Sequence, residues 1–167
     1  MSDPERSTLA GHVERGLVRL RLDATAPPGD IVRAVDALIE AEQVEREKAL
    51  KGLYLLLFKS PTALIAEAAA VWGEQVVREL SWTWQKVVRK DTPVRAIVAP
   101  QRTHVVFPDH YVSRMVEPPY DDNTLMLTFN LLEAGNLPAA APGAMEDITG
   151  SARHIVPKRV RPVYRRG

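Results

Sequence analysis

The sequence contains no cysteine, few aromatic residues and no long hydrophobic run. Without cysteine, the 167-residue chain forms no disulfide, no thiolate metal site and no cysteine nucleophile. No apolar run approaches the roughly 20 residues that span a bilayer, so no membrane segment is expected. The opening Met-Ser-Asp-Pro-Glu-Arg lacks the apolar stretch of a secretory signal, and we therefore expect a cytoplasmic protein.

Known catalytic and cofactor-binding motifs are also missing. The patterns GxGxxG, GxSxG and HExxH and the Walker loop do not occur. No cofactor, metal site or catalytic residue is therefore assigned. A cluster of polar residues near a predicted strand–helix junction could hold an anionic substrate. An enzyme of an unrecognised kind is therefore a third hypothesis, beside the two binding hypotheses given below. The residues of this cluster are Arg102, His104, Asp109, His110 and Arg114.

The net charge of +1 conceals an uneven distribution of charge. Residues 153–167 hold six of the 22 basic residues and no acid, which leaves 16 basic against 21 acidic residues over 1–152, a net charge of −5. An acidic body thus carries a basic C-terminal tail, and such asymmetry is typical of interaction arms. The six basic residues are Arg153, Lys158, Arg159, Arg161, Arg165 and Arg166.

Hydrophobic periodicity predicts a single α+β domain over residues 16–135. Residues 1–15 are polar and are expected to be a flexible lead, and residues 136–152 are rich in Ala, Pro and Gly and are expected to be a linker to the flexible tail. Helices are predicted over 30–58, 61–80, 109–116 and 124–134, and strands over 16–22, 82–88, 94–99 and 103–107.

The predicted architecture is helices packed on one face of a small antiparallel sheet of three to four strands. The last three strands would form a meander with a turn at Asp91-Thr92-Pro93, and strand 16–22 would add to an edge. Gly73 lies inside a predicted helix, where glycine costs up to about 1 kcal/mol relative to alanine, which indicates close packing of another element. Three tryptophans, Trp72, Trp82 and Trp84, are expected to pack together, the alternative being an exposed aromatic platform.

The central segment resembles small uncharacterised bacterial domains. The residues that carry the resemblance are Trp72-Gly73-Glu74, Leu80-Ser81-Trp82 and Phe107-Pro108, followed by a short helix with Arg114. Some similar domains accompany secreted toxins and are taken to be immunity or accessory proteins. The resemblance implies no catalytic residue, and this chain departs from the pattern at Ser81, where glycine is commoner, and in its basic tail.

Two binding hypotheses follow from these observations. The first is a non-catalytic protein-binding module, because an acidic body speeds the encounter with a basic partner protein. Its candidate contacts are Glu67, Glu74, Asp121 and Asp122. The alternative is contact with nucleic acid through the tail, whose six positive charges would neutralise phosphates.

Overall fold

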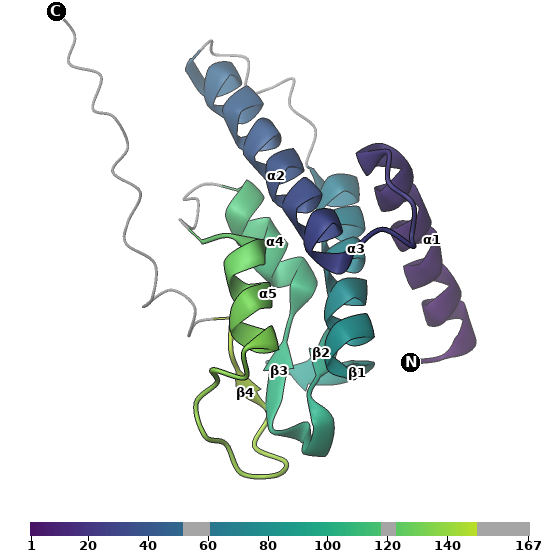
Figure 1. Cartoon of the computed structure of the whole chain (residues 1–167), viewed down its shortest axis with the longest axis vertical. Coiled ribbons are helices and arrows are strands. Elements are labelled where there is room, and N and C mark those ends of the chain that lie inside the picture. Colours follow the sequence, from purple (N-terminus) through teal and green to yellow (C-terminus); the bar gives the residue numbers. More distant parts are fainter. Residues whose placement is uncertain (52–60, 118–122, 150–167) are drawn as a thin grey trace, which may run out of the picture.

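The computed structural model describes residues 1–51, 61–117 and 123–149. Five α-helices pack with a four-stranded sheet (Figure 1), which confirms the predicted α+β fold. The helices are α1 (Asp3–Leu20), α2 (Pro28–Lys51), α3 (Thr62–Leu80), α4 (Pro108–Val116) and α5 (Leu125–Glu133), and the strands are β1 (Thr83–Arg89), β2 (Thr92–Val98), β3 (His104–Val106) and β4 (Glu146–Asp147).

Helix α3 lies at the centre of the molecule and contacts each of the other four helices. It carries the broad apolar stripe that the sequence predicts, and Trp72 and Val76 on this stripe are fully buried. The indole of Trp72 meets the ring of Tyr111 from α4 edge to face, with the centroids 5.6 Å apart. The main core therefore sits between α3, the surrounding helices and the helix-facing side of the sheet.

The sheet has the order β1-β2-β3-β4. Strands β1, β2 and β3 form the predicted antiparallel meander, but β4 runs parallel to β3, so the sheet is mixed rather than wholly antiparallel. The β1–β2 turn comprises Lys90 and Asp91, both with positive φ (48° and 61°), as a two-residue type I′ hairpin requires. The turn thus lies one residue earlier than predicted.

The prediction of a flexible lead over 1–15 and a strand over 16–22 is wrong, because α1, Asp3–Leu20, covers most of both segments. The side chain of Glu5 caps the helix by accepting the backbone N–H of Ser2 at 2.8 Å. Leu9 and Leu17 are buried and lie on one helical stripe. The alternation seen over 16–22 is the last turns of that helix, which ends at Arg21 with φ 56°.

Residues 136–149, which the sequence predicts to be a linker, return to the sheet. Strand β4 pairs with β3 in parallel, and Ile148 behind it is buried. The carbonyl of Pro138 accepts a hydrogen bond from Nε2 of His104 at 2.9 Å. The short strand β3 has an edge that β2 does not cover, and pairing with β4 satisfies its backbone groups.

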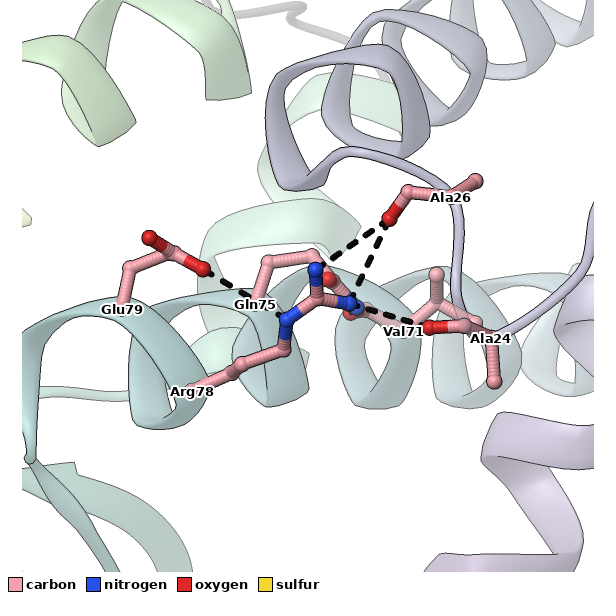
Figure 2. A network of polar contacts seen from close by, with 6 residues as sticks. All are labelled: Ala24, Ala26, Val71, Gln75, Arg78 and Glu79. Atoms are coloured by element: carbon pink, nitrogen blue, oxygen red, sulfur yellow. Dashed lines mark hydrogen bonds and ion pairs between the residues drawn. The ribbon is translucent and has the colours of Figure 1, made fainter.

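One arginine fixes the loop between α1 and α2. Figure 2 shows Nη1 of Arg78 donating to the carbonyls of Ala24 at 2.9 Å and Ala26 at 3.3 Å, while its Nε lies 3.4 Å from Oε1 of Glu79. The sequence pattern predicts an ion pair of Arg78 with Glu74 instead. The loop carbonyls need a donor, and the guanidinium supplies several N–H groups in one plane.

Some predictions fall outside the described residues. The predicted helix over 30–58 is seen as α2 up to Lys51, and its apolar part, 53–58, lies in the undescribed range 52–60. Within the described part of the chain, no helix is long and apolar enough to cross a membrane.

Candidate functional site

The two predicted contact residues on α3 are used inside the molecule. Glu67 is buried, and its carboxylate accepts from Nε of Arg19 at 2.8 Å and lies 3.5 Å from Nε of Arg15. Helix α1 therefore covers the face of α3 that carries Glu67, which makes this carboxylate inaccessible to a partner. Close approach of the two helices is possible because Gly16 has no Cβ: one placed there would clash with Val71 and lie 3.1 Å from the carbonyl oxygen of Glu67.

Glu74 is also engaged within the chain. Its Oε2 accepts the indole N–H of Trp84 at 3.2 Å, which ties α3 to β1. The helix can approach the strand because a Cβ at Gly73 would clash with the ring of Trp84, as the predicted close packing at this glycine requires. Trp72 and Trp82 are buried in the core, whereas Trp84 is half-buried at its border.

The remaining predicted contacts cannot be placed. Asp121 and Asp122 and the six basic residues of the tail (Arg153, Lys158, Arg159, Arg161, Arg165 and Arg166) lie outside the described residues. Nucleic-acid contact through the tail therefore stays a prediction of the sequence.

The five candidate residues of the enzyme hypothesis, at the predicted strand–helix junction, make separate structural contacts. His104 is buried, and its ring nitrogens bond the hydroxyl of Thr103 and the carbonyl of Pro138. Asp109 accepts two hydrogen bonds from Arg95, which is on β2.

Arg102 is exposed and points to the sulfur of Met145 at 3.0 Å. His110 and Arg114 lie on α4, one exposed and one half-buried. Among the described residues, no three His, Asp or Glu side chains are placed to hold a metal ion.

A different part of the molecule offers backbone groups to a ligand. Strand β1 is at the end of the sheet, and no other strand in the described part of the chain pairs with its outer edge. In a two-residue hairpin, the residues that flank the turn, Arg89 and Thr92, form a hydrogen-bonded pair, and such pairs alternate along the ladder. The N–H and C=O groups of Trp84, Lys86 and Val88 therefore point outward. Pro93 fits this assignment, since it opposes Val88 and has no N–H to donate.

Two cations face each other beside this outer edge. Lys86 of β1 lies directly opposite Arg95 of β2 in a non-hydrogen-bonded pair, the closer of the two kinds of cross-strand pair. Like charges opposite each other destabilise a sheet. Each cation here has a carboxylate from a different helix: Nζ of Lys86 is 2.5 Å from Oε1 of Glu5, and Arg95 makes a bidentate contact with Asp109 at 2.6 and 3.0 Å.

A cavity of about 280 Å³ lies between α1 and these two strands. Its lining residues are Met1, Pro4, Glu5, Thr8, Lys86 and Arg95. The hydrogen bonds from Lys86 and from the backbone N–H of Ser2 lower the pKa of Glu5 to about 2, so this carboxylate is ionised at neutral pH. We call the outer edge of β1 together with this cavity the β1 edge site.

Aromatic and imidazole groups border the same site. The guanidinium of Arg95 lies over the ring of Trp84, 5.2 Å from its centroid, and so joins Trp84 to Asp109. Burial lowers the pKa of His12, and the positive charges of Arg15 and Arg95 act in the same direction. Nη2 of Arg15 lies 3.0 Å from Nδ1 of His12, a contact in which the neutral ring accepts.

Glu5, Lys86 and Arg95 are not among the site residues that the sequence predicts. The pairing of Lys86 with Glu5 joins residues 81 positions apart, for which no local pattern exists. One signal was available: Trp84 and Lys86 alternate in a predicted strand and so share a face.

Comparison with known proteins adds no identification. No family model matches this chain, and neither a curated protein nor a solved structure is similar to it.

Proposed function

We propose that this protein is a non-catalytic protein-binding module that holds an extended segment of a partner protein along β1. The segment would add to the sheet as a further strand. In this mode of recognition, main-chain hydrogen bonds give affinity and pockets for alternate side chains give specificity. Roles as an immunity factor or as an accessory or assembly protein are both compatible with such binding.

The observation that carries the proposal is the outer edge of β1. Seven residues of extended chain, Thr83–Arg89, present the N–H and C=O groups of every second residue outward. Exposed strand edges are templates for pairing with another chain. Helix α1 packs mainly on α3 and contacts β1 through the ion pair of Glu5 with Lys86. Val88, with 70% of its surface exposed, adds an apolar side chain that a partner strand would cover.

The electrostatics of the site favour binding over catalysis. A general acid or base works best with a pKa near the working pH. Glu5, with a pKa of about 2, is far from that value. Arg95 and Asp109 are fixed to each other by two hydrogen bonds and serve to hold β2 against α4.

The proposal is tested by selecting peptides from a random display library on the full chain. Val88→Pro removes an outward N–H without touching the β1–β2 ladder, and proline is tolerated on a strand edge when its nitrogen faces solvent. Val88→Thr is the matched control, because it makes the side chain more polar at nearly the same size but keeps the N–H. Loss of one intermolecular hydrogen bond should weaken binding by about five- to tenfold in the proline variant only.

Nuclear magnetic resonance provides a second measurement. On binding, the amide protons of Lys86 and Val88 should become protected from exchange, whereas those of Gln85 and Val87 are already bonded to β2. Selected peptides that bind the proline variant and the wild type equally well would refute the strand-addition mode. So would a selection that enriches no peptide at all.

A further inference from the structure

Lys86, the cation at the middle of β1, is paired with a carboxylate that a carboxylate of another chain could replace. Lys86 contacts only one oxygen of Glu5, and both side chains are substantially exposed, at 48% and 36%. Arg95 differs, because both oxygens of Asp109 hold it and its side chain is 19% exposed. Of the two opposed cations, Lys86 is therefore the one whose contact is open to exchange.

A strand added to β1 would place a side chain directly beside Lys86. The backbone groups of Lys86 point outward, and residues opposite each other in neighbouring strands share a face at about 5 Å between Cβ atoms. That face is the one with the cavity, since Lys86 and Arg95 both line it. The incoming side chain thus lies beside Lys86, with Arg95 one strand further on, at the border of a cavity of about 280 Å³ that Glu5 also lines.

We propose, resting on the strand-addition function above, that the partner segment carries an acidic residue in register with Lys86 and that its carboxylate replaces Glu5 there. Charge complementarity supports this choice of side chain. Lys86 and Arg95 oppose each other on the helix-facing side of the sheet, and Lys86 is held by a single carboxylate oxygen. A cationic side chain at this position would lie beside Lys86 and compete with it for Glu5, whereas an acidic one can pair with the ammonium group.

The exchange leaves α1 intact. Glu5 uses its second oxygen, Oε2, to accept the backbone N–H of Ser2, and this contact caps the helix without help from Lys86. A freed Glu5 remains at the N-terminus of α1, where a negative charge is favourable. The ammonium group therefore changes partner while the capped first turn stays in place.

The test uses two heptapeptides, acetyl-Thr-Val-Thr-Asp-Thr-Val-Thr-amide and its Asn counterpart. They differ only at the central side chain, which ends in a carboxylate in one peptide and in a carboxamide in the other. Their affinities for the full chain are measured by fluorescence anisotropy at low and high salt. An exposed ion pair predicts that the Asp peptide binds roughly two- to fivefold more tightly at low salt and that the difference shrinks at high salt. Lys86→Met, which keeps the aliphatic stem, should abolish the difference, and Glu5→Gln should enlarge it.

The outcomes separate this inference from the function on which it rests. Equal binding of both peptides to the wild type, with binding to Val88→Pro weakened by about five- to tenfold, would overturn the acidic preference and leave strand addition standing. The display selection yields peptides whose binding is weakened by Val88→Pro, which we call proline-sensitive. If neither heptapeptide binds and these proline-sensitive peptides lack an acidic residue, the acidic preference is likewise overturned. Absence of any proline-sensitive peptide would overturn both.

Discussion

The contact between Gly73 and Trp84 allows a quantitative prediction about how the site is held. Gly73→Ala would place a methyl group on α3 at a position 2.5 Å from Cη2 of Trp84 and 2.8 Å from Cδ1 of Ile97. The indole cannot move aside easily, because its N–H is bonded to Glu74 and its face is covered by Arg95.

Two opposing terms set the size of the effect. Alanine in a helix interior gains about 0.5–1 kcal/mol over glycine. Inserting a methyl group into a packed site costs about 1–3 kcal/mol. The two terms leave a net cost of about 0–2.5 kcal/mol. Because the added methyl group would approach the ring to less than 3 Å, we expect Gly73→Ala to fall in the upper part of this range and to lower the free energy of unfolding by about 1–2.5 kcal/mol, measured by urea denaturation and far-ultraviolet circular dichroism.

A double-mutant cycle isolates the clash. In a Trp84→Val background the obstructing ring is gone, and the close contact that remains is with Cδ1 of Ile97, the far end of a flexible side chain. Gly73→Ala should therefore become neutral or stabilise by up to about 0.5 kcal/mol. If the alanine substitution destabilises both backgrounds equally, the clash with the indole is not its cause and the argument fails. A stabilised single variant would refute it as well.

Three further substitutions probe the fold. Asp36 of α2 accepts the backbone N–H groups of Leu125 and Met126 at 2.8 and 2.9 Å. Asp36→Ala should therefore lower the free energy of unfolding in urea by about 1–2 kcal/mol. A smaller decrease than that of the exposed control Asp3→Ala would contradict the capping role. Asp91 has a positive φ in a type I′ turn, so Asp91→Gly should raise the free energy of unfolding by about 0.5–1 kcal/mol, whereas Thr92→Gly should lower it. The pKa of Glu5 is about 2 in the folded chain, against 4.5 for an unperturbed glutamate. The contribution of this carboxylate to stability is therefore complete above about pH 4.5 and is lost as the pH falls toward 2. Glu5→Gln should flatten the plot of unfolding free energy against pH in that window only.

The sequence predicted those elements whose signals are local. Helix α3 follows a Ser-Pro start and carries a long apolar stripe, and the strands of the hairpin are rich in β-branched and aromatic residues. Helix α1 was missed because a seven-residue window over 16–22 fits both a strand and the end of an amphipathic helix. A local signal for the helix start was present in the Ser2-x-x-Glu5 capping box with Pro4 in the first turn. Two tertiary effects, the packing of Gly16 on α3 and the burial of Glu67, show that the later turns are helical as well.

The β1 edge site could not be predicted for a related reason. A shift of one residue in the register of a hairpin moves every side chain to the opposite face. The predicted turn was displaced by one residue, so the opposition of Lys86 and Arg95 was not visible. The carboxylates that neutralise them come from α1 and α4, elements whose approach to the sheet no local pattern encodes.

The order of the strands has a practical consequence for attaching this protein to a surface or to a label. β1 and β4 occupy opposite edges of the sheet, about 14 Å apart at the usual strand spacing, and Glu146 in β4 is exposed. Met1, by contrast, lines the cavity beside β1. A label attached at Glu146 therefore leaves the β1 edge accessible, whereas a tag fused before Met1 would sit against the cavity and mask the binding it was meant to report.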